Sequence, residues 1–220
     1  MTSLANQTTP SESRVERKRR LTRERIVHEA ERLMRTQPLE DITIGDITSA
    51  ADVGHGTFYI HFKSKYEVLI PITRNMAERW DQALQQATSH LEDPAEVVAI
   101  SVRYMGRAVI ADPLWRWMLK HSGMPMDDMR NAIGRFAARD FGRGLQSRRF
   151  QVADLPAANS FLIGGFVTSL LASVDSENSD EAIDHMAELI LRTLGIGVEE
   201  ASPIAHQTLP PLATPTGELP

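Results

Sequence analysis

The segment from Ile42 to Lys65, ITIGDITSAADVGHGTFYIHFKSK, constrains the fold of this chain more than any other feature of the sequence. Thr43 stands just before an apolar-periodic run, and Asp46 follows three residues later. A threonine hydroxyl and an acidic side chain at this spacing can cap a helix reciprocally. A helix is therefore predicted to begin at Thr43.

The rest of the segment indicates a turn and a second helix. The first helix carries an apolar stripe at helical spacing, made of Ile44, Ile47, Ala50 and Ala51. Asp52-Val53-Gly54 then ends the run with a glycine that can adopt a positive φ. In the following run, Phe58 and Phe62 fall on one face and leave polar groups on the others. Such a helix can pack against its own domain and still present polar groups outward.

This pattern resembles the helix-turn-helix of the TetR family of bacterial transcriptional regulators. The resemblance rests on Ala51, Val53, Gly56, Thr57, Phe58, Tyr59, His61, Phe62, Ser64 and Lys65, and it covers Arg23 to about Ile72. Two positions depart from the usual pattern, since Asp52 replaces a glycine and Gly54 replaces a serine. The resemblance implies that the second helix lies in the major groove of DNA, with its N-terminal residues closest to the base edges.

The same resemblance implies a set of DNA contacts. His55 is the candidate for reading bases, and Gly56 permits a close approach of the backbone. The expected phosphate contacts are Thr43, Gly45, Thr57, Tyr59, His61 and Lys65. Two alternatives remain open: Tyr59 as a half-buried aromatic residue, and His61 as a histidine that favours the helix dipole.

The charge distribution supports a nucleic-acid partner although the chain is acidic overall, with 24 Lys and Arg against 29 Asp and Glu. Residues up to Tyr66 include 11 basic and 9 acidic side chains, and the remainder has 13 basic against 20 acidic. The positive charge is densest in Arg14, Arg17, Lys18, Arg19, Arg20, Arg23 and Arg25. We therefore add Arg20 and Arg23 to the expected DNA contacts, with a solvated helix start as the alternative.

Beyond Lys65 the pattern is that of long helices with short breaks, so the fold class is all-α. Asp93-Pro94 is a strong helix start, with a capping acid followed by proline at the first helical position. We predict a disordered, basic arm over residues 1–20, a helix-turn-helix domain over 21–66, a helical ligand-binding and dimerisation domain over 67–200, and a flexible, proline-rich tail over 201–220.

A stripe of small residues predicts close helix packing near the C-terminus. Ser160, Gly164, Thr168 and Ala172 recur every four residues, and the next helix has an apolar face that includes Ile183, Ala187 and Ile190. Packing within one subunit would explain both features. The resemblance instead implies that these two helices pair with those of a second subunit, so we expect a homodimer.

The middle of the chain contains aromatic and flexible side chains that suit an irregular apolar pocket. The expected pocket residues are Tyr104, Met105, Trp115, Met118, His121, Phe136 and Phe161. Arg103 and Arg107, one turn apart, are candidates for meeting a polar group of a ligand. Plain core packing is the alternative, and the resemblance favours a small lipophilic effector.

No motif indicates catalysis, a metal site or a cofactor. With no cysteine and no apolar run near the roughly 20 residues that cross a bilayer, we expect a cytoplasmic protein without a membrane partner. The resulting hypothesis is a ligand-responsive repressor that binds double-stranded, palindromic operator DNA as a dimer. The alternatives are a ligand-independent or architectural DNA-binding protein, and a helical small-molecule-binding protein.

Overall fold

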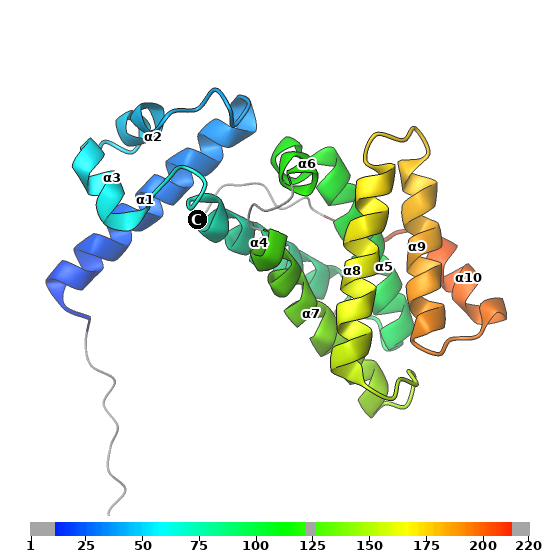
Figure 1. The fold of residues 1–220 in the computed structure, drawn as a ribbon. Helices are drawn as coiled ribbons and strands as arrows, with labels where there is room; N and C mark the ends of the chain where they lie inside the picture. Colours follow the sequence, from blue (N-terminus) through cyan, green and yellow to red (C-terminus); the bar gives the residue numbers. More distant parts are fainter. Residues whose placement is uncertain (1–11, 122–125, 213–220) are drawn as a thin grey trace, which may run out of the picture. The chain divides into compact units, whose positions relative to one another are not determined.

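The computed structural model describes residues 12–121 and 126–212, and the described side chains exclude those of residues 126–129. The described residues form helices and contain no strand, as the sequence predicted (Figure 1). The chain divides into two compact units, one ending at Val68 and the other beginning at Leu69.

The first unit contains three helices, α1 (Arg14–Thr36), α2 (Ile44–Ala50) and α3 (His55–His61). Their contacts bury a small apolar core of Ile26, Ala30, Ile42, Ile47, Phe58 and Phe62. Thr43 caps α2 as predicted: its hydroxyl accepts a hydrogen bond from the Asp46 amide, and the Asp46 carboxylate accepts one from the Thr43 amide. Phe58 and Phe62 anchor α3 in this core, with ring centroids 5.7 Å apart.

The first helix begins earlier than predicted. We expected residues 14–20 to belong to a disordered arm, but α1 starts at Arg14, where Ser13 and Glu16 form a reciprocal cap. Further along α1, Arg20 pairs with Glu24, one helical turn away, at 3.0 Å. The cap and the ion pair stabilise the helix over residues 14–20, which in the sequence alone look like a run of basic residues.

The turn between α2 and α3 also differs from the prediction. Gly54 has an ordinary negative φ of −73°, whereas Asp52 adopts the left-handed conformation, with φ 49°. The Arg25 guanidinium donates a hydrogen bond to the Asp52 carbonyl at 3.2 Å. Asp52 therefore takes the conformation that glycine adopts without steric cost.

The second unit is a helical bundle. It contains α4 (Leu69–Ala87), α5 (Pro94–Ala111), α6 (Pro113–Lys120), α7 (Met126–Gln146), α8 (Leu155–Ser173), α9 (Ser179–Thr193) and α10 (Val198–His206). The predicted cap at Asp93 is present, since its carboxylate accepts a hydrogen bond from the Ala95 amide at 2.8 Å. Helix α5 packs against α6, α7, α9 and α10, and Gly106 lets it approach α9, since a Cβ there would lie 2.9 Å from Ile183.

The C-terminal region corrects another prediction. Residues 198–206 form α10, although residues from 201 onward were expected to be a flexible tail. Ala201 and Ala205, one turn apart, are fully buried where α10 packs on α9 and α5. Two alanines provide little apolar signal in the sequence, and Pro203 suggested a break.

Candidate DNA-binding and ligand-binding sites

The outward surface of α3 has the exposed groups that a recognition helix needs. Tyr59 is 56% exposed, which leaves part of its ring open to a partner. His55 and Gly56 are also exposed, and a Cβ added at Gly56 would meet nothing within 4 Å. Nothing within the described chain therefore requires glycine at this position, and its bare backbone is open to a close partner.

The base-reading candidate, His55, is held against α2. Its Nδ1 lies 3.4 Å from the Thr48 hydroxyl. Its ring also lies close to Gly45, because a Cβ added at that glycine would be 3.6 Å from the ring. Because Thr48 is buried, this contact fixes one edge of the imidazole while the side chain stays exposed. Thr43 and Gly45 lie at the start of α2, and the Thr43 hydroxyl also donates to Asp46 at 2.6 Å.

A positively charged cluster surrounds the end of α3. The Arg23 guanidinium lies 4.8 Å from the centroid of the Phe62 ring, which orients it beside the helix end. Burial lowers the pKa of His61, and the charges of Arg19 and Arg23 lower it further. The structure thus brings together His61 and Arg23, two of the expected contacts, and adds Arg19.

Lys65 does not fit the expected phosphate contact. Its ammonium donates hydrogen bonds to three carbonyl oxygens, those of Leu39, Glu40 and Ile42, at 2.8, 3.1 and 2.7 Å. An ammonium has three donors, so all of them are used within the first unit. We therefore assign Lys65 to holding the loop between α1 and α2.

Arg20 is a second residue that does not fit its expected DNA contact. Its guanidinium pairs with Glu12 at 2.9 Å and with Glu24 at 3.0 Å. Two carboxylates thus compensate its charge, so Arg20 presents no net positive charge to a phosphate. The abundance of basic residues in this stretch hides the pairing, because only the helix places Arg20 next to Glu24.

An apolar cavity of about 80 Å³ lies within the second unit. Its wall is formed by α4, α5, α7, α8 and α9, and includes Leu84, Val98, Val102, Met105, Ile133, Phe136, Phe141, Leu162, Ile163, Phe166 and Ile190. Met105 and Phe136 are the two expected pocket residues that line it. Three polar side chains complete the wall: Asp81, Ser101 and Asp140.

Arg139 joins the two carboxylates of this wall. It donates two hydrogen bonds to Asp81, both at 2.9 Å, and two to Asp140, at 2.9 and 3.1 Å. The hydrogen bonds to Asp81, followed by those to Asp140, raise the pKa of Arg139 above its usual range. Asp81 and Asp140 have side chains only 11% exposed, so the pair is largely withdrawn from water.

The other expected pocket residues do not line the cavity. Trp115 and Met118 are buried in the core, and His121 stacks on Trp117 with ring centroids 4.1 Å apart. The Tyr104 hydroxyl donates to the Pro210 carbonyl. Phe161 is 70% exposed and projects from α8. Large apolar side chains occur in core, pocket and surface alike, so residue type alone does not separate these environments.

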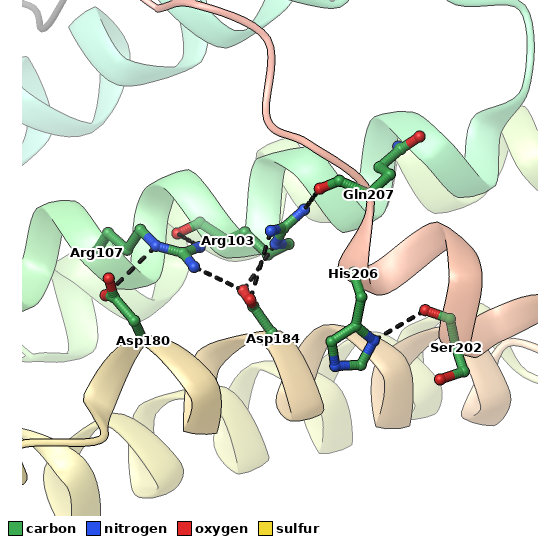
Figure 2. A network of polar contacts seen from close by, with 7 residues as sticks. All are labelled: Arg103, Arg107, Asp180, Asp184, Ser202, His206 and Gln207. Carbon is green, nitrogen blue, oxygen red and sulfur yellow. Dashed lines mark hydrogen bonds and ion pairs between the residues drawn. The ribbon is translucent and has the colours of Figure 1, made fainter.

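The two arginines of α5 form part of a structural network (Figure 2). Arg103 donates to Asp184 at 2.7 Å and to the Gln207 carbonyl at 2.6 Å, and Arg107 pairs with Asp184 at 2.8 Å and with Asp180 at 3.3 Å. These contacts join α5 to α9 and to the segment after α10. Neither arginine lines the cavity, so the candidate role of Arg103 and Arg107 as ligand contacts is not supported.

Each of the two units matches the model of a known protein family. Residues 26–71 match the family model for bacterial regulatory proteins of the tetR family, and residues 93–207 match the model for the tetracyclin repressor-like C-terminal domain.

The chain belongs to the TetR family.

Individual relatives agree with this assignment. The crystal structure of RolR with resorcinol is 30% identical and covers 90% of this chain and 99% of its own, with a TM-score of 0.81. The regulator EthR of Mycobacterium tuberculosis is 35% identical over 71 residues, a match that spans only 32% of that protein's length. FadR of Thermus thermophilus with lauroyl-CoA, at 17% identity, covers 80% of this chain and 96% of its own with a TM-score of 0.66, and shows the shared fold.

In this TetR-family chain, α8 exposes much of its apolar surface. Ser160, Thr168 and Ala172 of the small-residue stripe are exposed, and a Cβ added at Gly164 would meet nothing within 4 Å. Among the described helices, α8 alone is long and apolar enough to cross a membrane by length and composition, yet only 22% of that stretch is buried. Such an apolar face on a helix of a globular unit suits a partner surface.

The predicted role of the apolar face of α9 in the dimer interface is wrong. Ile183, Ala187 and Ile190 were expected at the dimer interface, but they are buried within the unit, where α9 packs on α5. Leu189, 60% exposed, instead lies on the outer side of α9, and α8 and α9 are neighbours in Figure 1. Periodicity identifies an apolar face of a helix without identifying what covers it.

Proposed function

We propose that this chain is a ligand-responsive transcriptional repressor that binds palindromic operator DNA as a homodimer in the cytoplasm. The observation that carries the proposal is the outward surface of α3, where exposed His55, Gly56 and Tyr59 stand on a helix anchored by buried Phe58. Family membership makes this helix the recognition helix, which reads base edges from its N-terminal end.

In this proposal the DNA contacts divide into two kinds. His55 and Gly56 approach the base edges, while Thr43, Gly45, Thr57, Tyr59, His61 and Arg23 hold the phosphates and thereby fix the position of α3. Arg19 joins the second group because it lies beside His61. Asp52, where the family usually has glycine, adds a negative charge close to this surface.

The cavity of the second unit supports ligand responsiveness. It combines apolar walls with a few buried polar groups, the usual composition of a small-molecule site. The relative RolR, which covers nearly the same length, is described in complex with resorcinol. We infer that a small molecule in this cavity stabilises a conformation with lower affinity for DNA.

The homodimer is supported by the exposed face of α8. A helix-turn-helix dimer reads two half-sites that are related by the two-fold symmetry of the protein. The small-residue stripe of α8 and the exposed Phe161 and Leu171 on the same helix, with exposed Leu189 on the neighbouring α9, provide an apolar surface for a second copy.

Selection of bound fragments from random duplex DNA, followed by footprinting, tests the proposal. We expect enrichment of a palindrome with two protected half-sites. His55→Ala should change the preferred bases, whereas Arg23→Ala should weaken binding to all sequences and reduce its salt dependence. Enrichment of no palindrome by the wild-type protein would exclude the proposed function.

A further inference from the structure

The charged groups at the cavity leave it with a negative balance. Asp81 and Asp140 line the wall, and Arg139 is the cation that bridges them. Two carboxylates and one guanidinium sum to one net negative charge. This charge is held by side chains that are mostly buried, where it is weakly screened by water.

The hydrogen-bonding capacity left at the cavity is mainly that of an acceptor. An ionised carboxylate offers about four acceptor sites. Asp81 accepts from Arg139 twice and from Gln85 once, and Asp140 accepts from Arg139 twice, so both retain acceptor sites. Four hydrogen bonds from Arg139 go to these two carboxylates, and its guanidinium does not line the wall. The Ser101 hydroxyl is the other polar group there.

The remaining wall suits a flat apolar body. Phe136, Phe141 and Phe166 contribute three aromatic rings, and aliphatic side chains complete the surface. The volume of about 80 Å³ favours a single small ring over a long acyl chain. Aromatic rings attract one another in offset or edge-to-face geometry in addition to the effect of apolar burial.

We propose that the cavity selects small aromatic ligands that donate hydrogen bonds and carry no negative charge, such as hydroxylated benzenes, and that Asp81 and Asp140 determine this selectivity. The proposal rests on the proposed function, because it names the ligand class of the same site. A hydroxyl donates to a carboxylate in a charge-assisted hydrogen bond. A carboxylate on the ligand would lose its hydration and face two like charges.

Three matched compounds test this selectivity with the full-length protein. Resorcinol has two hydroxyl donors, 1,3-dimethoxybenzene has the same ring without donors, and 3-hydroxybenzoate replaces one hydroxyl by a carboxylate that is ionised at neutral pH. By calorimetric titration we expect resorcinol to bind at least about tenfold more tightly than either of the other two, the factor for one charge-assisted hydrogen bond.

Asp140→Asn tests the assigned residue, because it removes the charge and keeps the shape. We expect this variant to bind resorcinol about tenfold more weakly and to bind 3-hydroxybenzoate more tightly than the wild type does. Asp175→Asn is the matched control, since Asp175 is exposed and pairs with Lys120 at 2.8 Å outside the cavity. It should leave both affinities unchanged.

Opposite changes for the two ligands are the result that a merely structural role of Asp140 would not produce. The proposal is overturned if 3-hydroxybenzoate binds the wild type as tightly as resorcinol does, if Asp140→Asn weakens both ligands equally, or if resorcinol does not bind. The selection of operator DNA with ligand-free protein is a separate experiment, and it tests the proposed repressor without testing ligand binding. Failure there would reject the proposed repressor and leave the ligand selectivity intact.

Discussion

Asp52 carries backbone strain in the turn before the recognition helix. With φ at 49°, it occupies the left-handed region, which aspartate tolerates better than most side chains but glycine tolerates best. We predict that Asp52→Gly raises the free energy of unfolding by about 0.5 kcal/mol and Asp52→Ala lowers it by about 1 kcal/mol. Urea denaturation measures both changes. A glycine variant less stable than the wild type would mean that the aspartate side chain stabilises the turn.

Lys65 illustrates how a basic residue near DNA can serve the fold. Since its ammonium satisfies three carbonyl oxygens, Lys65→Ala should lower the free energy of unfolding of the first unit by about 1–3 kcal/mol. Lys63→Ala, at an exposed neighbouring lysine, is the control and should have little effect. Denaturation and the salt dependence of DNA binding are measured together. A flatter salt dependence with unchanged stability would restore Lys65 as a phosphate contact.

We predict that His61 makes DNA binding sensitive to pH. Burial, followed by Arg19 and Arg23, lowers its pKa below the ordinary 6.5, so the folded protein binds this proton less readily than the unfolded chain. Its contribution to stability is therefore complete above about pH 6.5 and falls as the pH drops below that value. A phosphate beside the ring favours the protonated form.

We therefore predict that operator affinity rises between about pH 7.5 and about pH 6, and that His61→Gln reduces this rise. Fluorescence anisotropy at constant ionic strength provides the measurement. His28→Gln, on the exposed surface of α1, is the control that should retain the wild-type pH dependence. An identical pH profile for His61→Gln and the wild type would remove His61 from the phosphate contacts.

Among the described elements, α8 is the one on which we place the proposed dimer interface. Phe161→Glu places a charge in the apolar face, so we predict dissociation of the dimer into folded monomers. Because Phe161 is 70% exposed within the chain, the helical content should not change. Light scattering after gel filtration, with circular dichroism, measures both properties. Val198→Glu replaces another exposed apolar residue, on α10, and should remain dimeric.

Local signals in the sequence predicted two capped helix starts, although the cap of α1 at Ser13 was missed. Thr43 and Asp93 place two helix starts correctly, because caps depend on a few neighbouring residues. Helix α10 was missed because its stability comes from burying Ala201 and Ala205 against distant helices. The cavity was also not predictable from local signals, because its polar groups come from residues that are distant in the sequence. Asp81 and Asp140 resemble solvated carboxylates until Arg139 and the packing of α4 on α7 bring them together.

At the scale of the whole molecule, the two sites are expected to influence each other equally. If a bound ligand lowers operator affinity by a given factor, operator DNA must lower ligand affinity by the same factor. We predict this equality for resorcinol, measured by titration with and without an operator duplex. A scrambled duplex is the control. Ligand affinity unaffected by operator DNA would show that the cavity does not regulate DNA binding.

The division into a unit ending at Val68 and a unit beginning at Leu69 has a genetic consequence. In the proposed dimer, a copy with a damaged α3 keeps its α8 intact and should still associate with an undamaged copy. Such a mixed pair would present one functional recognition helix to a palindrome that requires two. Alleles that damage α3 should therefore be dominant over the wild type in a cell that expresses both, whereas alleles that damage the α8 surface should be recessive.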